Sequence, residues 1–156
     1  MITSGLVYPV AATFDAAGHL YVSDEGNTSG RIVVFAPPYT GAPLFCISNT
    51  SQALRGIAVD AHGNLYVGDL GTNGVNTGMV HVYQAPLTSI STVAFDIVTG
   101  VNSPEELSMD NAGDLYVASA VAPSPPNVYA PPFSKSSAPK LTVGSVESDF
   151  GIAIGP

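Results

Sequence analysis

Basic residues are scarce in this sequence. Its 156 residues include four lysines and arginines against twelve aspartates and glutamates, a formal net charge of −8. Nucleic-acid binding depends on clustered cations that neutralise phosphates, and anionic membrane surfaces attract basic segments. The basic residues here are scattered along the chain: Arg31, Arg55, Lys135 and Lys140. We therefore expect no nucleic-acid partner and no membrane insertion.

Tryptophan is absent and cysteine occurs once, at Cys46. A single cysteine excludes a disulfide within the chain, and no base stands beside Cys46 in a recognisable motif, which favours a small buried hydrophobe over a nucleophile. No apolar run approaches the roughly 20 residues of a membrane span, and no signal peptide is visible at the start of the sequence. The low lysine content and the polar loops favour a bacterial secreted, periplasmic or cell-surface protein.

The sequence also has no long stretch in which apolar residues recur at helical spacing. Glycine and proline number 16 and 13, and they interrupt every stretch in which apolar residues could recur at helical spacing. Because 46% of the residues are hydrophobic and only 10% are charged, the chain is not expected to be disordered. The composition thus indicates a folded all-β protein rich in turns.

One segment recurs three times without gaps, at residues 14–24, 59–69 and 109–119, with offsets of 45 and 50 residues. Each copy contains an aspartate, a glycine three residues later, and then Leu-Tyr-Val. The carboxylate can accept hydrogen bonds from N–H groups of the turn, and glycine supplies the left-handed conformation that closes a tight hairpin. The recurring aspartates Asp15, Asp60 and Asp110 are therefore predicted to be structural.

Each repeat predicts four antiparallel strands. In the second copy a strand of small residues, 56–59, precedes the hairpin and Leu-Tyr-Val follows it. Third strands are predicted at 31–35, 79–83 and 127–129, each ended by proline, and fourth strands at 44–47, 93–98 and 141–143. Four strands in about 45 residues is the size of a β-propeller blade, whereas β-solenoids use shorter coils and helical solenoids need helical periodicity.

The sequence therefore predicts one all-β domain over residues 1–156, a β-propeller segment of three four-stranded antiparallel blades plus the first strand of a fourth. The blade repeats are expected at about 11–50, 56–100 and 106–146, with a partial start at 151–156. A closed propeller usually has four to eight blades. Three explanations stay open: part of a longer six-bladed protein, a homodimer that closes a three-plus-three ring, or a free-standing arc.

The pattern in residues 56–69, Gly-Ile-Ala-Val-Asp followed by Gly-Asn-Leu-Tyr-Val-Gly-Asp, and the later strand ending in Tyr83, resembles the NHL repeat. The resemblance implies a propeller but no single function, because NHL-like propellers include protein- and RNA-binding modules, extracellular bacterial proteins and relatives of lyases and lactonases. The third copy departs from the pattern, with Glu106-Leu107-Ser108-Met109 in the first strand and Ser119 where the others have Asp24 and Asp69.

Candidate binding residues lie in the loops that enter the first strands and in those that follow the second strands. In the usual propeller layout these loops share one face, where variable loops carry binding groups on a rigid scaffold. Arg55 and Glu105 come just before first strands at equivalent positions. The set is Arg55, Glu105, Asp24, Glu25, Asn27, Asp69 and Asn73. We expect this face to bind a protein or a small polar ligand.

No motif supports a cofactor or a catalytic residue. Oxygens of Asp24, Asp69, Asn27 and Asn73 could contribute to a Ca²⁺ site, but no loop has the dense acidic spacing of calcium-binding loops. No pair of histidines has the spacing of zinc ligands. A non-enzymatic binding module is therefore expected. The alternatives are part of a lactonase- or lyase-like propeller enzyme with a divalent metal, and a structural spacer in a surface protein.

Overall fold

The computed structural model describes residues 2, 4–51, 53–71, 77–119, 121 and 124–144. Within them the protein is built from strands, turns and bends, without a helix, and so without any helix that could cross a membrane. The predicted fourth start at 151–156 lies outside the described residues.

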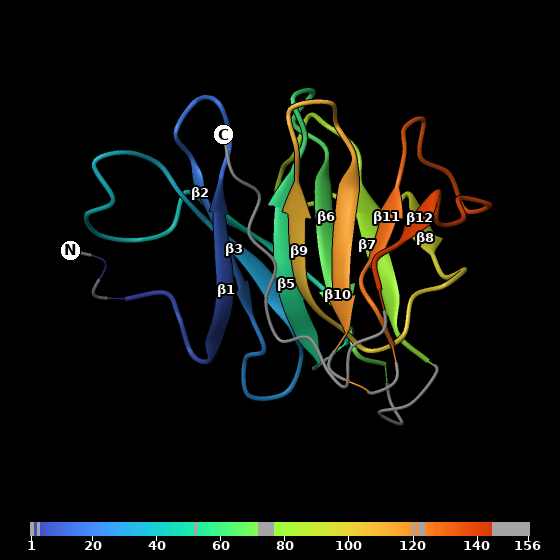
Figure 1. Ribbon diagram of the computed structural model, residues 1–156. Coiled ribbons are helices and arrows are strands. Elements are labelled where there is room, and N and C mark those ends of the chain that lie inside the picture. Colours follow the sequence, from blue (N-terminus) through green and yellow to red (C-terminus); the bar gives the residue numbers. More distant parts are fainter. Residues whose placement is uncertain are drawn as a thin grey trace.

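Three four-stranded antiparallel sheets make up the protein (Figure 1). In each sheet the strands pair in the order of the chain, so that every connection joins neighbours. Sheet 1 contains β1 (Pro9–Phe14), β2 (Leu20–Asp24), β3 (Arg31–Phe35) and β4 (Phe45–Ser48). Sheet 2 contains β5 (Leu54–Val59), β6 (Leu65–Asp69), β7 (Met79–Tyr83) and β8 (Phe95–Ile97). Sheet 3 contains β9 (Pro104–Met109), β10 (Leu115–Ser119), β11 (Asn127–Tyr129) and β12 (Leu141–Thr142).

The third strands β3, β7 and β11 have the bounds that the sequence predicts. The fourth strands differ at their ends. β8 is shorter than the predicted 93–98 at both ends: it begins at Phe95, and it ends before Val98 because Val98 belongs to a turn in which the N–H of Val101 donates to the carbonyl of Val98. The prediction of four antiparallel strands per repeat is confirmed for the sheets.

The hairpin turns before β2, β6 and β10 have one common structure. In each turn the aspartate carboxylate accepts two backbone N–H groups at 2.8 to 2.9 Å, from the residues two and four positions later. The glycine of each turn is left-handed, with φ of 82° at Gly18, 82° at Gly63 and 84° at Gly113. The roles predicted for the recurring aspartate and glycine are confirmed.

The sheets stack face to face in chain order. One core cluster joins sheet 1 to sheet 2 and includes Ile32, Ile47, Leu65 and Val67. A second joins sheet 2 to sheet 3, through residues that include Val80, Ile97 and Leu115. The middle Leu-Tyr-Val strand, β6, is buried on both faces, because Leu65 and Val67 pack against sheet 1 and Tyr66 packs against sheet 3. Burial of these apolar side chains is the main force that holds the sheets together.

The first strands of the three sheets lie side by side: β1 contacts β5, and β5 contacts β9 (Figure 1). Gly56 permits the closest approach. A Cβ atom at this position would lie 2.4 Å from the backbone nitrogen of Leu107 and 2.7 Å from the carbonyl carbon of Glu106. The backbones of β5 and β9 therefore touch where only glycine fits.

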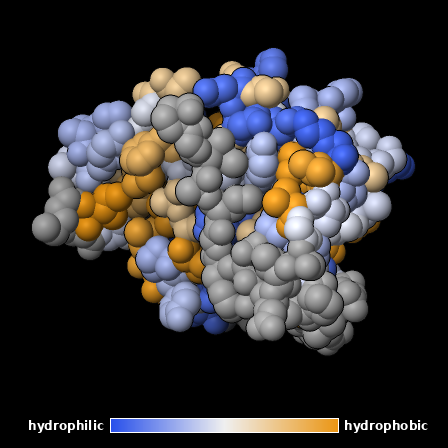
Figure 2. All heavy atoms as spheres, in the orientation of Figure 1, coloured by the Kyte–Doolittle hydropathy of each residue, from blue (hydrophilic) through white to orange (hydrophobic). Residues whose placement is uncertain are grey.

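The stacked sheets have two distinct ends. The end that carries the tight turns before β2, β6 and β10 is called the hairpin end, and the opposite end, where β5 and β9 begin, is called the loop end. Figure 2 shows hydrophilic residues gathered over the hairpin ends of β5, β6, β9 and β10, at the top of the view. The predicted binding face is the loop end.

Candidate functional site

A groove runs between the first strands of the three sheets. Its volume is about 370 Å³, and residues 12–14 of β1, 57–59 of β5 and 106–109 of β9 line it. Every sheet contributes its first strand, so residues of all three sheets line this groove.

Arg55 links all three sheets at the loop end of this groove. From β5 its guanidinium reaches Glu25, in the loop after β2 of sheet 1, through Nη1. Its Nε lies 3.5 Å from a carboxylate oxygen of Glu105, in β9 of sheet 3. The three side chains are 21%, 19% and 27% exposed, so they are partly accessible to a ligand. Glu25, Arg55 and Glu105 are called the bridging cluster below.

The backbone beneath the bridging cluster is also tied across sheets. The hydroxyl of Ser23, which is fully buried in β2, lies 2.7 Å from the carbonyl oxygen of Arg55 and donates to it. This contact fixes the backbone of β5 against sheet 1 just where the Arg55 side chain leaves the strand. The hydrogen bond from Ser23 therefore helps to position the Arg55 side chain.

Glu106 adds a further acidic group beside the cluster. Burial raises the pKa of its carboxyl group, and the negative charge of the neighbouring Glu105 raises it further. One guanidinium thus faces two carboxylates, with a third acid close by whose ionised form is disfavoured. The site carries a net negative charge.

Asp24 lies below the loop end rather than on it. Its side chain is fully buried. It accepts hydrogen bonds from the backbone N–H groups of Val7 and Tyr8, at 3.0 and 2.5 Å, and it forms an ion pair with Arg31 at 2.8 Å. Burial opposes the ionised form, yet these hydrogen bonds outweigh it and lower the pKa of Asp24. The geometry gives this carboxylate the role of joining the N-terminal segment to sheet 1.

Asp69 is the counterpart of Asp24 in sheet 2, and it is 4% exposed. The Nε2 atom of His81 lies 2.9 Å from Asp69, while the Nδ1 atom lies 2.7 Å from Asp96. Burial alone would lower the pKa of His81, but the two carboxylates raise it above its ordinary value. Both ring nitrogens therefore donate, and the imidazolium form is favoured.

The Asp69–His81 pair forms part of the wall of a polar cavity of about 780 Å³ at the loop end. Its other walls include Asn49 and Ser51 from the segment between β4 and β5. The sequence predicts the strand at 79–83 that contains His81 but indicates no partner for its side chain. The pairing depends on cross-strand neighbours, since His81 lies opposite Asp96 and two residues beyond the partner of Asp69.

The predicted site residues thus fall into three groups. Glu25, Arg55 and Glu105 come together in the bridging cluster. Asp24 and Asp69 are buried in separate ion pairs within their own sheets. Asn27 is exposed in the loop after β2, and Asn73 lies outside the described residues. Among the described residues, no group of three or more His, Cys, Asp or Glu side chains is arranged to hold a metal ion.

Comparison with known proteins gives no assignment. No protein-family model matches the chain, and no curated protein matches it. The candidate function is therefore drawn from the residues and contacts of the chain itself.

Proposed function

We propose that the three sheets are consecutive blades of an NHL-like β-propeller. Two observations support this arrangement: the sheets stack face to face in chain order, and their first strands β1, β5 and β9 lie together around one groove. In a propeller the first strand of each blade lines the central channel, and the later strands point outward. The groove would then be part of that channel.

We propose further that the protein is a non-enzymatic binding module that takes a small polar ligand or a protein partner at the loop end. The bridging cluster is the observation that supports this function most strongly. It brings one charged side chain from each sheet to the mouth of the groove, partly exposed and held by the packed scaffold below. Preorganised polar groups at the rim of a hollow are typical of ligand sites.

The charges of the cluster favour a particular ligand chemistry. Two carboxylates face one guanidinium, and the chain as a whole carries a net charge of −8. Like-charge repulsion disfavours an anionic ligand. An ammonium group or an amide N–H group, in contrast, can donate hydrogen bonds to the carboxylates. We therefore expect a cationic or neutral polar group on the ligand or on the partner.

The residues at the loop end give less support to a catalytic role. His81 is the most buried imidazole there, and both of its nitrogens are bonded to carboxylates. An imidazolium with both N–H groups engaged has no free lone pair with which to act as a general base. The Asp69–His81–Asp96 group is better suited to hold β6, β7 and β8 together.

The binding proposal can be tested through the Nε–H signal of Arg55 in ¹⁵N-resolved NMR spectra. The probes are putrescine, acetamide and sodium succinate, added separately to the full chain. We expect saturable shifts of the Arg55 signal with the amine or the amide and none with the dicarboxylate. Glu105→Gln should weaken the amine response. A response to succinate alone, or to none of the three, would count against the loop-end site.

The state of assembly is a separate part of the proposal. Three blades would leave two open ends, which a second copy could cover in a three-plus-three ring or which the rest of a longer chain could cover. Light scattering on the 156-residue chain distinguishes these cases. A mass of two chains supports the homodimer, and a monodisperse monomer in dilute solution excludes it.

A further inference from the structure

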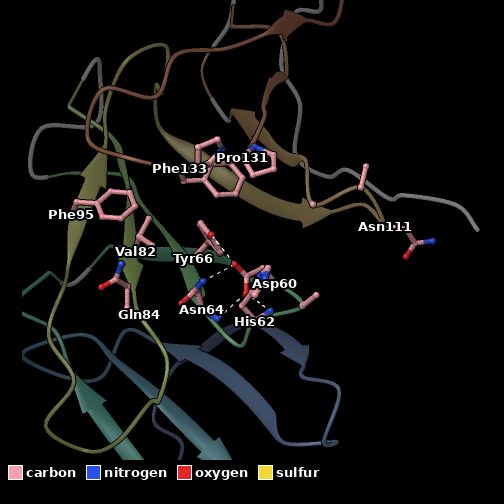
Figure 3. Close-up of a pocket in the computed structure, with 14 residues that line it drawn as sticks. Asp60, His62, Asn64, Tyr66, Val82, Gln84, Phe95, Asn111, Pro131 and Phe133 are labelled. Atoms are coloured by element: carbon pink, nitrogen blue, oxygen red, sulfur yellow. Dashed lines mark hydrogen bonds between the residues drawn. The ribbon is translucent and has the colours of Figure 1, made fainter.

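A second cavity lies between sheets 2 and 3 at the hairpin end, opposite the bridging cluster (Figure 3). Its volume is about 480 Å³, which falls within the range of small-molecule pockets. The turn before β6, the end of β7, the start of β8, the turn before β10 and the segment after β11 all contribute to its walls. The loop-end proposal does not involve this cavity.

One wall of the cavity is aromatic. The rings of Tyr66 and Phe133 meet edge to face, with centroids 5.2 Å apart and planes at 69°. Figure 3 shows the ring of Phe95 pointing toward Phe133 and Pro131, with Tyr66 below them. Tyr66 is fully buried, whereas Phe95 and Phe133 are only partly buried, so their rings offer apolar area to a ligand.

Among the described lining residues the one carboxylate, that of Asp60, already has all its acceptor sites engaged. Asp60 accepts hydrogen bonds from the backbone N–H groups of His62 and Asn64, from the Asn64 amide and from the hydroxyl of Tyr66. No lysine or arginine lines the described walls of the cavity. The site therefore offers no cation to an anionic ligand, and its own carboxylate has little capacity left for a cationic one.

The rim supplies amide and imidazole hydrogen-bonding groups instead. His62, Gln84 and Asn111 border the cavity on three different segments, and all three residues are exposed. Amides and neutral imidazole each offer both a donor and an acceptor. Such groups match a ligand whose polar atoms both donate and accept.

The corresponding region between sheets 1 and 2 shows that this polar rim is not required by the fold. The turns and strand pairings fix the equivalent positions of the two regions. The counterparts of His62, Gln84 and Asn111 are the alanines Ala17, Ala36 and Ala61, and the counterpart of Phe133 is Leu87. The region between sheets 1 and 2 thus has three alanines where the second cavity has two amides and an imidazole, and a leucine where the cavity has a phenylalanine.

We propose that the second cavity binds a neutral carbohydrate, with one pyranose ring against Phe95 and Phe133. A pyranose has apolar C–H faces that pack on aromatic rings and a belt of hydroxyls that both donate and accept hydrogen bonds. The rim residues Gln84, Asn111 and His62 offer donors and acceptors that are complementary to that belt. Hydrophobic contact supplies part of the binding and the amides supply selectivity.

The test is a titration followed by ¹H–¹⁵N NMR, with the methyl glycosides of glucose, galactose and mannose and with cellobiose, maltose and lactose as probes. Each is added to about 20 mM, which covers the millimolar affinities expected of small neutral ligands. We expect at least one sugar to give saturable shifts of the Gln84 and Asn111 side-chain amides. The Gln84→Ala/Asn111→Ala double variant should weaken binding about tenfold or more.

Two further variants make the result decisive. Phe133→Leu installs the residue that the sheet 1–sheet 2 region already uses, so it should fold normally and weaken binding. Thr40→Ala, on the exposed segment after β3, is the control and should bind as the parent protein does. The proposal is overturned if none of the six sugars shifts these signals, if the double variant binds unchanged, or if choline or acetate binds in the cavity and the sugars do not.

Discussion

The hydroxyl of Tyr66 donates a hydrogen bond to the carboxylate of Asp60 at 3.0 Å. The same contact joins Tyr21 to Asp15 and Tyr116 to Asp110, each at 3.2 Å. Burial, with the nearby carboxylate, raises the pKa of Tyr21 to about 12, so this hydroxyl stays protonated and donates throughout the physiological range. One aspartate in each repeat thus closes the hairpin and anchors the tyrosine of the following strand.

Removing this hydroxyl should cost stability in proportion to the burial of the ring. Tyr66→Phe loses one hydrogen bond to a carboxylate, which we expect to lower the free energy of unfolding by about 1.5 kcal/mol. Asp60→Ala loses all four hydrogen bonds that the carboxylate accepts and should cost more. Tyr116→Phe should cost less than Tyr66→Phe, because Tyr116 is less buried. Urea denaturation measures all three, and the reverse order for the tyrosines would contradict this ranking.

Gly56→Ala should force β5 and β9 apart. The new methyl group would lie 2.4 Å from the Leu107 nitrogen, against backbone that cannot give way easily. We expect a loss of about 2 kcal/mol, in the range of overpacked core sites. Gly68→Ala is the matched control, since its methyl group would meet the nearest atom, the carbonyl oxygen of Pro104, at 3.1 Å. Equal stabilities of the two variants would argue against the close approach.

The stability of the protein should depend on pH through His81 and Asp69. The pKa of His81 is raised above 6.5, so its contribution is complete below about pH 6.5 and is lost as the pH rises through the raised value. The pKa of Asp69 is lowered below 3.8, because hydrogen bonds from His81 and Gly71 outweigh the opposing effect of burial. Its contribution is complete above that pH and is lost as the pH falls through the lowered value. This pair should therefore stabilise the protein most between about pH 4 and 6.5.

His81→Asn tests this assignment. It leaves the buried Asp69 without its cation and should cost about 3 kcal/mol near pH 6, while abolishing the loss of stability at higher pH. The double variant Asp69→Ser/His81→Asn copies the residues Ser119 and Asn127 that sheet 3 has at these positions. It should be more stable than His81→Asn alone. An unchanged alkaline profile in His81→Asn would show that another group causes it.

The bridging cluster should couple sheet 1 to sheet 2 energetically. We expect a double-mutant cycle with Arg55→Gln and Glu25→Gln to give a coupling energy of about 1 kcal/mol, near the upper end for partly exposed ion pairs. The coupling should shrink in high salt, because screening weakens exposed charges most. Strict additivity of the two single variants would mean that the ion pair does not form in solution.

The parts of the fold that sequence could predict are those set by nearby residues. The Asp60 turn needs a carboxylate and a glycine within four positions, and both are visible in the repeat. The third strands are bounded by the chemistry of proline, which cannot donate to a ladder. The equivalent positions of Arg55 and Glu105 in the repeat predict that they share the loop face, and they lie in the same cluster, although inside β5 and β9 rather than just before the first strands.

The features that the sequence did not predict depend on the pairing register of strands and on the packing of segments that are distant in the chain. The pairing of Asp24 with Arg31 requires these residues to lie directly opposite in β2 and β3, and the His81 pairs require the registers of two ladders at once. The second cavity requires the stacking of sheets 2 and 3, which brings Phe95 to Phe133. One signal was available in the sequence: Gln84 and Asn111 occupy positions at which the region between sheets 1 and 2 has alanine.

The most direct test of the stacked arrangement is a nuclear Overhauser measurement between Gly56 and Leu107. These residues are far apart in sequence and belong to different sheets, yet a Cβ at Gly56 would touch the Leu107 nitrogen. A strong cross-peak between an α-proton of Gly56 and the amide proton of Leu107 is predicted. Its absence, in a sample whose sheet 2 and sheet 3 ladders are both intact, would contradict the packing of β5 on β9 from which the groove and the bridging cluster are built.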